Sequence, residues 1–331
     1  MKILATGGAG YIGSHVVLAL LEAGHSAVVV DDFSTGSPEA LERVQSLAGR
    51  RCELYEGDIS DGVLLEQALI GVDAVIHFAA FKAVGESMEA PERYFRNNLG
   101  GMATLLERMV EAGVDRIVYS SSAAVYGSQE LQPIPEDAPL RPDSPYGMSK
   151  LHGEQMLEWM VQRRGWRATS LRYFNPVGAH GSGRIGEPIE GGSNLFPRIL
   201  EAYADPSRAL TVFGTDYSTP DGTCLRDYIH VVDLARAHLL ALESQTSPAH
   251  RIYNVGTGRP LSVREVLEAF QAVTGERVPH ADGPRRPGDV MACSAESARF
   301  AEQAGFEAAL GLEEMVRSAW RWALENPRGY A

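Results

Sequence analysis

The sequence predicts an α/β fold built on a doubly wound parallel sheet, with a smaller C-terminal substrate-binding lobe. Short apolar segments recur through the first half of the 331-residue chain, and stretches with helical periodicity separate most of them. Glycines stand at three-residue intervals directly after the first apolar segment. A glycine- and proline-rich stretch, residues 176–192, then interrupts the alternation where a sheet domain would give way to a second lobe.

The expected strands of the sheet are Ile3–Ala5, Ala27–Val30, Cys52–Tyr55, Ala74–Phe78, Arg116–Ser120 and Ala168–Tyr173. Strands that alternate with helices indicate a parallel sheet covered by helices on both faces. A later strand candidate, Ile252–Val255, is expected to return to this sheet. We therefore expect a first domain of residues 1–176 with a return segment near 230–258, and a lobe formed mainly by residues 177–331.

A glycine-rich turn, Gly7-Gly8-Ala9-Gly10-Tyr11-Ile12-Gly13, follows the first strand and opens the first helix, which continues at helical period to Leu21. Glycines allow a tight turn and let the main chain approach a pyrophosphate, whose charge meets the free N–H groups at the helix N-terminus. This arrangement is typical of a Rossmann-type dinucleotide-binding domain.

The second strand ends in Asp31-Asp32, roughly where the dinucleotide fingerprint expects a carboxylate for the adenosine ribose. Asp31 would accept hydrogen bonds from the 2′- and 3′-hydroxyls. A 2′-phosphate at that place would meet like charge with no arginine nearby. The sequence therefore favours NAD over NADP.

Composition excludes several classes of protein. Apolar residues make up 44% and charged residues 22%, which fits a globular protein and neither a disordered nor a fibrous one. A net charge of −13 disfavours nucleic acid and anionic membranes as partners, so an anionic substrate would need a local basic cluster. Cys52, Cys224 and Cys293 suggest neither a disulfide framework nor a metal site. With no apolar run of membrane-spanning length, we expect a soluble, cytoplasmic protein.

Tyr146 and Lys150 stand four residues apart, which places both on one face of a helix that Pro142 and Pro145 would start. A cation about 4 Å from a phenol, at an effective dielectric near 20, is worth roughly 4 kcal/mol, or about three pKa units. We therefore expect Lys150 to lower the pKa of Tyr146 and make it a usable base. The positive nicotinamide ring would help.

Serines close the strand Arg116–Tyr119, and the last of them, Ser122, is expected at the carboxyl edge of the sheet, where ligands of this fold bind. There it would share a reacting hydroxyl with Tyr146. The alternative is that these serines only form a turn or cap a helix.

Long blocks elsewhere carry a resemblance: Phe81–Ser87, Arg172–Ala179 and Arg226–Val231. With the glycine turn and the Ser122, Tyr146 and Lys150 set, they make the chain resemble the UDP-glucose 4-epimerases of the extended short-chain dehydrogenase/reductase family over essentially its whole length. The resemblance implies an isomerase of galactose metabolism that keeps NAD bound. Tyr146 would take the proton of the sugar 4-hydroxyl while hydride leaves C4, and a 4-keto sugar would then be reduced on its other face.

The resemblance also implies the residues of the site. Those for the cofactor are Gly7, Gly10, Tyr11, Ile12, Gly13, Asp31, Asp32, Ser34, Thr35, Gly36, Asp58, Ile59, Phe78, Ala79, Ala80, Lys82, Asn97, Ser120, Tyr146, Lys150 and Tyr173. Those for the UDP-sugar are Lys82, Ser122, Tyr146, Phe174, Asn175, Asn194, Leu195, Thr211, Phe213, Arg226, Tyr228, Arg286, Asp289 and Cys293. Arginines suit a diphosphate because their planar fork donates two hydrogen bonds at once. No metal ligand is implied, and His77 and His230 are interpreted as structural.

Cys293 falls where some members of the family carry a tyrosine that narrows the sugar pocket and others carry a small residue. We therefore expect this chain also to accept UDP-GlcNAc and UDP-GalNAc. The alternative is a small core cysteine with no sugar contact. The resemblance further implies a homodimer that pairs helices around Met102–Val110 and Leu151–Val161.

Other functions are weighed against this one. A 4,6-dehydratase is disfavoured, because related dehydratases carry acidic residues directly after the active-site hydroxyl and here Ala123-Ala124 follow Ser122. A UDP-pentose (xylose or arabinose) 4-epimerase would use the same residues and remains open. So does a non-catalytic NAD-binding sensor, since fold alone does not establish function.

Overall fold

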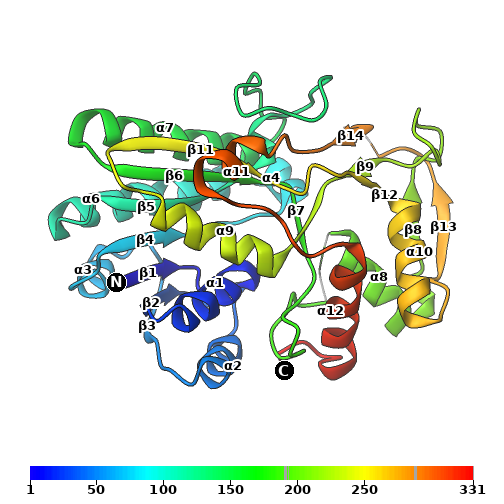
Figure 1. The fold of residues 1–331 in the computed structure, drawn as a ribbon, viewed down its shortest axis with the longest axis horizontal. Coiled ribbons are helices and arrows are strands. Elements are labelled where there is room, and N and C mark those ends of the chain that lie inside the picture. The colour runs from blue at the N-terminus through cyan, green and yellow to red at the C-terminus, as the bar shows by residue number, and fades with distance from the viewer. Residues whose placement is uncertain (190–191, 193, 287–288, 331) are drawn as a thin grey trace.

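The computed structural model describes residues 1–189, 192, 194–286 and 289–330. Its centre is a seven-stranded sheet in the order β11-β6-β5-β4-β1-β2-β3, in which every pairing is parallel (Figure 1). The strands are β1 (Lys2–Thr6), β2 (Ser26–Asp31), β3 (Glu53–Glu56), β4 (Ala74–His77), β5 (Arg116–Ser122), β6 (Arg167–Tyr173) and β11 (Ala249–Val255). The predicted doubly wound fold is confirmed.

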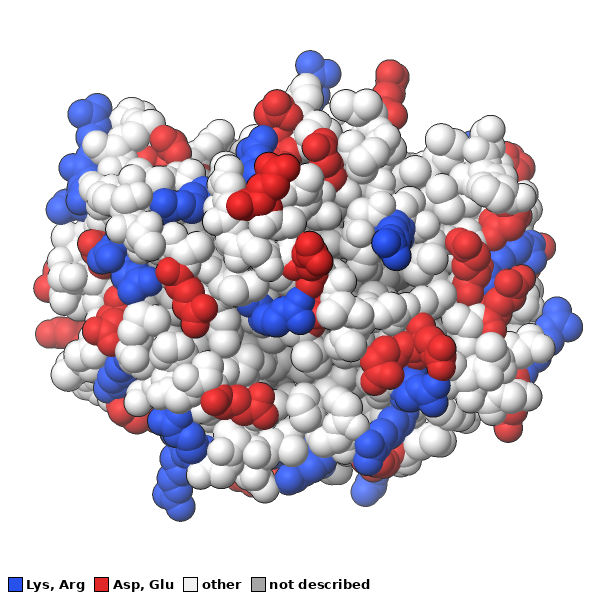
Figure 2. Space-filling model, viewed as in Figure 1, with Lys and Arg blue, Asp and Glu red and all other residues white. Residues whose placement is uncertain are grey.

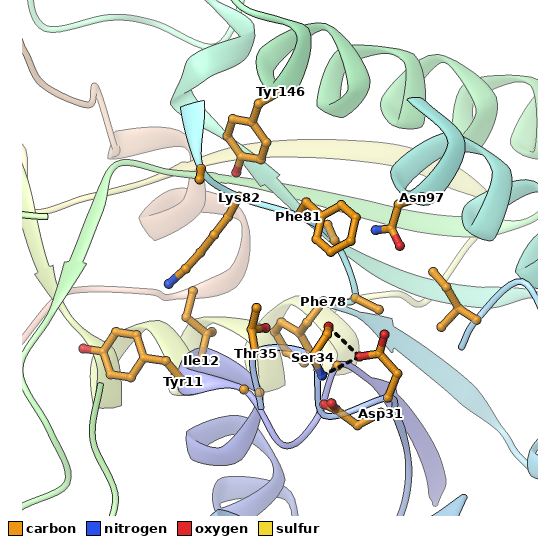
Figure 3. A pocket seen from close by; sticks show the side chains of 18 of the residues that line it. Tyr11, Ile12, Asp31, Ser34, Thr35, Phe78, Phe81, Lys82, Asn97 and Tyr146 are labelled. Atoms are coloured by element: carbon orange, nitrogen blue, oxygen red, sulfur yellow. Dashed lines mark hydrogen bonds between the residues drawn. The ribbon is translucent and has the colours of Figure 1, made fainter. Parts of the chain in front are cut away.

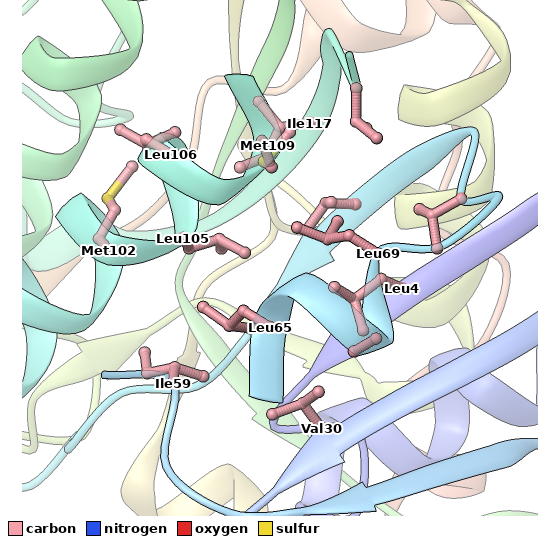
Figure 4. Packing of buried hydrophobic residues seen from close by; sticks show 14 of the residues in the cluster. Leu4, Val30, Ile59, Leu65, Leu69, Met102, Leu105, Leu106, Met109 and Ile117 are labelled. Atoms are coloured by element: carbon pink, nitrogen blue, oxygen red, sulfur yellow. The ribbon is translucent and has the colours of Figure 1, made fainter. Parts of the chain in front are cut away.

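Helices cover both faces of the sheet because alternate strand residues point to opposite sides. Ile3 packs on the side of α1 and α9, and its neighbour Leu4 packs on the side of α3, α6 and α7. The helices of these layers are α1 (Tyr11–Glu22), α2 (Pro38–Ala48), α9 (Val231–Glu243) and α11 (Ala298–Ala304) on one face, and α3 (Gly62–Ala68), α6 (Gly101–Ala112) and α7 (Pro145–Arg164) on the other. Figure 4 shows the second interface, where Leu105 and Met109 of α6 approach Leu4 and Ile117 of the strands.

The connection between β4 and α6 consists of the short helices α4 (Val84–Glu89) and α5 (Pro91–Tyr94) and a π-helical segment, Phe95–Gly100. Single-turn 3-10 helices at Ala123–Val125 and Pro206–Arg208 follow β5 and α8.

α7 begins at Pro145, as the upstream prolines predict. The hydroxyl of Ser144 caps it by accepting a hydrogen bond of 3.1 Å from the amide of Gly147.

A smaller assembly packs beside the carboxyl edge of the sheet around its own apolar cluster. Its helices are α8 (Leu195–Ala204), α10 (Val263–Thr274) and α12 (Leu312–Glu325). Its strands form short sheets: β7 (Asn175–Val177) with β10 (Tyr228–His230), β8 (Leu210–Phe213) with β13 (His280–Gly283), and β9 (Leu225–Arg226) between β12 (Leu261–Ser262) and β14 (Ala292–Cys293).

The net charge of −13 is not concentrated on the face in Figure 2, where acidic and basic side chains are interspersed among uncharged ones. Within the described part of the chain, no helix combines the length and the hydropathy that crossing a bilayer requires.

Candidate active site

A cavity of about 480 Å³ opens at the carboxyl edge of the sheet, between the glycine turn and the first turn of α7 (Figure 3). Most of the expected cofactor residues line it: Gly7, Gly10, Tyr11, Ile12, Gly13, Asp31, Asp32, Ser34, Thr35, Asp58, Ile59, Phe78, Ala79, Ala80, Lys82, Asn97, Tyr146, Lys150 and Tyr173. Gly36 instead lines a second, neighbouring cavity, and Ser120 lies behind Lys150. The structure therefore brings residues from five strand ends to one space.

The glycine turn has a geometry that larger residues would block. Gly7 adopts φ +71°, and a Cβ there would lie 2.7 Å from the amide nitrogen of Ala79. A Cβ on Gly13 would lie 2.2 Å from the carbonyl oxygen of Gly7. Because these positions exclude a side chain, the amides at the start of α1 stay open to an anionic ligand.

Asp31 has a structural role as well as the expected ribose contact. Its carboxylate accepts hydrogen bonds from the amides of Ala9 at 2.8 Å and Phe33 at 2.9 Å, which joins the glycine turn to the end of β2. Burial raises the pKa of Asp31, while the two amide bonds act in the opposite direction. Figure 3 shows Asp31 and Ser34 at the far end of the cavity from Tyr146.

Ser122, Tyr146 and Lys150 come together at the other end of the cavity. Ser122 lies beside Tyr146 and acts to lower the pKa of the phenol. Its hydroxyl also caps the 3-10 helix Ala123–Val125 by accepting a hydrogen bond of 3.2 Å from the amide of Ala124. The ammonium of Lys150 donates a hydrogen bond of 2.7 Å to the carbonyl of Ser120 and lies 5.9 Å from the centroid of the Tyr146 ring. A phenol and an amine thus line the cavity wall with a hydroxyl beside the phenol, and such groups can remove a proton from a bound alcohol.

The electrostatics of this cluster differ from the sequence-based expectation. Burial raises the pKa of Tyr146, and the neighbouring Ser122 hydroxyl acts in the opposite direction. Burial also lowers the pKa of Lys150 to about 7, because desolvation disfavours the charged amine. Tyr146 and Lys150 both lie on α7, as their spacing predicts. Desolvation of both groups opposes the lowering of the Tyr146 pKa that we expected from Lys150.

The expected substrate residues fall into two groups. Lys82, Tyr146 and Asn194 line the main cavity, with Ser122 beside Tyr146. The others lie outside its wall, at the end of β6 and in the smaller lobe: Phe174, Asn175, Leu195, Thr211, Phe213, Arg226, Tyr228, Arg286, Asp289 and Cys293.

Contacts tie several residues of the second group to one another. Arg226 pairs with Asp289 and also donates to the carbonyl of Val290 at 2.9 Å, and the guanidinium of Arg286 lies 4.2 Å from the centroid of the Phe213 ring. Pro287 and Gly288, which complete the expected basic motif, lie outside the described residues.

Glu187 and Asn98 contribute to the site and were not predicted. The Glu187 side chain lines the cavity at 12% exposure, 3.4 Å from the ammonium of Lys82, and burial raises its pKa. Asn98, in the π-helical segment, accepts from the amide of Phe81 at 2.9 Å and donates to the Ser149 hydroxyl at 3.0 Å, which joins the cavity wall to α7. Neither residue has a motif that could have identified it, because both act through contacts distant in sequence.

The two histidines have structural contacts. His77 shares a hydrogen bond of 2.7 Å with the hydroxyl of Thr6, and burial lowers its pKa to about 3. His230 caps α9 by accepting a hydrogen bond of 3.1 Å from the amide of Val232. Among the residues with described positions, no three His, Cys, Asp or Glu side chains gather as a metal site requires.

Comparison with known proteins finds relatives that match this chain over nearly its full length. The chain is 48% identical over 335 residues to a UDP-glucose 4-epimerase of Bacillus subtilis (strain 168), covering 100% of this chain and 99% of the relative. The human UDP-glucose 4-epimerase is 47% identical over 341 residues, covering 99% and 98%. These relatives confirm the resemblance seen in the sequence.

Solved structures of similar proteins have the same fold as this chain. A UDP-glucose 4-epimerase of Bifidobacterium longum in complex with NAD+ and UDP superposes with a TM-score of 0.94 at 42% identity, covering 99% of this chain and 100% of that one. The enzyme of Stenotrophomonas maltophila, with bound NAD and formylated UDP-arabinopyranose, gives 0.96 at 41% identity, covering 99% of each chain. Residues 3–256 match the family described as NAD dependent epimerase/dehydratase. The chain belongs to the NAD dependent epimerase/dehydratase family.

Proposed function

We propose that this protein is a UDP-glucose 4-epimerase, which interconverts UDP-glucose and UDP-galactose by inverting C4 with tightly bound NAD. The observation that carries the proposal is the cavity that joins the glycine turn and Asp31 to Tyr146 and Lys150, with Ser122 beside the phenol. Full-length relatives of that name support the choice of reaction.

The residues present fit a dinucleotide. The turn at Gly7 and Gly13 has no room for side chains, and Asp31 stands at the end of β2, where a ribose can be held. When bound, NAD would supply a hydride acceptor and a positive charge. We assign the pyrophosphate to the amides of the glycine turn and the adenosine ribose to Asp31.

Tyr146 is the proposed base, which takes the proton of the sugar 4-hydroxyl while hydride leaves C4. Ser122 shares that hydroxyl and keeps it aligned with the phenol. The carbonyl of Ser120 holds the Lys150 amine close to Tyr146, so that Lys150 in its protonated form stabilises the phenolate. The proton returns from Tyr146 when the keto sugar is reduced on its opposite face.

For the nucleotide-sugar, we propose that Arg226 and Arg286 bind the diphosphate and that Asp289 binds the uridine ribose. The pairing of Arg226 with Asp289 and the position of Arg286 over Phe213 support a shared uridine diphosphate site. Asn175 and Asn194 would hold the diphosphate and sugar. Cys293 is half-buried and pairs with Arg226 in the parallel register of β14 and β9. Its small side chain would leave room for an N-acetyl group.

Products identify the reaction directly. Purified protein, without added NAD, is incubated separately with UDP-galactose, UDP-GalNAc and UDP-arabinose, and the products are identified by NMR. We expect UDP-glucose from UDP-galactose. A UDP-pentose 4-epimerase is the second candidate, because a structure 41% identical to this chain holds formylated UDP-arabinopyranose. Conversion of UDP-arabinose alone would favour it, and no conversion of any sugar would favour a non-catalytic sensor.

We further propose that the protein acts in the cytoplasm as a homodimer that pairs α6 and α7 of two copies. Trp159 of α7 is 57% exposed, although large aromatic side chains are usually buried, and this supports a partner surface at this helix.

We also propose a division of roles along the chain. Residues 1–176, with the return segment, bind NAD, and residues 177–331 mainly bind the UDP-sugar.

A further inference from the structure

Asp227, between β9 and β10, is fully buried at 0% exposure. One carboxylate oxygen accepts hydrogen bonds of 2.8 Å from both the amide and the hydroxyl of Thr257. The other accepts from the amide of Gly258 at 2.9 Å and the amide of Ala295 at 3.0 Å. A buried carboxylate is costly unless such donors surround it, and here four donors do.

The backbone of Asp227 makes two further connections. Its amide donates to the carbonyl of Cys293 at 3.0 Å, and its carbonyl accepts from the amide of Asn175 at 3.1 Å and from the Asn175 side-chain amide at 2.9 Å. Asp227 thus bonds to β7, to the turn after β11, and to the strand β14 and the residues that follow it. These segments are far apart in the sequence.

The turn after β11 approaches the carboxylate so closely that it requires a glycine. A Cβ on Gly256 would lie 2.5 Å from a carboxylate oxygen of Asp227 and 2.8 Å from the Cβ of Ala295. Contacts this short do not occur between such atoms, so Gly256, Asp227 and Ala295 form one close-packed junction.

Two of the segments at this junction carry a residue of the proposed UDP-sugar site, Asn175 on β7 and Cys293 on β14, and Arg226 of that site is next to Asp227 itself. The side chain of Arg226 turns away to Asp289, so the carboxylate of Asp227 does not serve as its ion-pair partner. We propose that Asp227 is a positioning residue that holds the UDP-binding side of the site together, while the NAD-binding side is independent of it. This inference rests on the proposed function.

The test compares Asp227→Asn with Asp233→Asn. Asp233 is a matched control, because it is also buried and accepts two backbone hydrogen bonds, from Ala309 at 2.9 Å and Leu310 at 2.8 Å, but it lies on α9 away from the junction. In Asp227→Asn, the side-chain NH2 faces amide donors in place of an acceptor. We expect UDP to bind at least about tenfold more weakly and the KM for UDP-galactose to rise, with NAD content unchanged.

Isothermal titration with UDP, absorbance of bound NAD and a thermal melt are measured for each variant. Asp233→Asn should lower the melting temperature without changing the affinity for UDP. Asp227→Asn with wild-type affinity for UDP would overturn the inference, and so would equal loss of UDP and NAD binding. If Asp227→Asn does not fold, the variant Thr257→Val is tested in its place, because it removes the hydroxyl that donates to the Asp227 carboxylate. Weaker UDP binding with NAD retained would then support the inference, and unchanged UDP binding would overturn it. Wild-type protein that binds no UDP would instead refute the proposed function.

Discussion

Tyr146 and Lys150 lie in surroundings that oppose their charged forms. Burial raises the pKa of the phenol and lowers the pKa of the amine to about 7. A base in such a place works only when a hydrogen bond or a cation offsets the desolvation. The Ser122 hydroxyl beside the phenol acts to lower its pKa, and the bound cofactor would supply positive charge.

Replacing Tyr146 with Phe removes the proposed base and keeps the ring. We expect epimerisation to fall by a factor of about 10² to 10⁴, because this is the usual contribution of general acid–base catalysis, while NAD remains bound. Turnover of UDP-galactose and the absorbance of bound cofactor measure the two effects. Unchanged turnover would refute the assignment.

The lowered pKa of Lys150 makes stability depend on pH. Between about pH 7 and the ordinary pKa of lysine, the unfolded chain binds a proton that the folded chain has released, so the free energy of unfolding rises with pH. Below about pH 7 both states are protonated, and the cost of burying the charge is fully present. Relative to Lys150→Met, the wild type should gain roughly 1.4 kcal/mol per pH unit inside this window. Urea titrations of both proteins at pH 7 and 9, at equal NAD content, measure it, and parallel pH profiles would contradict it.

Cys293 should control the size of the sugar that fits. Burial raises the pKa of its thiol to about 11, so the side chain acts as a small neutral group. We expect the wild type to turn over UDP-GlcNAc and Cys293→Tyr to lose this activity while keeping UDP-galactose turnover, because the ring would occupy the space for the N-acetyl group. Equal activity of both proteins with UDP-GlcNAc, or none in the wild type, would contradict this.

The helix α7, which carries Tyr146 and Lys150, is anchored to the sheet by a buried ion pair. Glu154 of α7 accepts hydrogen bonds of 2.9 Å and 2.6 Å from the guanidinium of Arg172 on β6. Arg172 also donates to the hydroxyl of Tyr126 at 2.9 Å. Because α7 begins with Tyr146 and Lys150 and β6 ends at the cofactor-site residue Tyr173, this pair fixes the helix against the strand beside the site.

Breaking the pair should destabilise the protein strongly. Arg172→Met leaves the buried Glu154 carboxylate without its ion-pair partner and with only the hydrogen bond from the Ser121 hydroxyl, and breaking such a pair typically costs about 3–5 kcal/mol of unfolding free energy. The double variant Glu154→Leu with Arg172→Met should recover much of that loss, because no unpaired charge remains. Urea unfolding of the three proteins measures this, and a double variant less stable than the single one would argue against it.

Across the molecule, the proposed dimer predicts a response to charge on α7. Trp159→Glu places a carboxylate on an exposed face that we expect a second copy to cover, so the variant should be monomeric. Light scattering coupled to size exclusion measures the mass. Glu158→Gln, one residue away, is the control and should leave the mass unchanged. A wild type that is already monomeric would contradict the proposal.

Local sequence patterns predicted much of the fold. The strands, the glycine turn and the helical spacing of Tyr146 and Lys150 are short-range features, since each depends on residues within a few positions. The structure confirms the parallel doubly wound sheet and brings most of the expected cofactor residues to one cavity. Asp31 illustrates a limit, because its bonds to Ala9 and Phe33 depend on the packing of two elements.

The sequence by itself determined the Rossmann-type fold, the preference for NAD and the type of chemistry, because turns, periodicity and side-chain spacing specify these locally. Only the tertiary structure decided the order of the strands, the approach of Glu187 to Lys82 and the junction at Asp227. It also decided the pKa directions at Tyr146 and Lys150. Desolvation and long-range hydrogen bonds depend on which distant segments pack together, and that depends on the burial of the whole core at once.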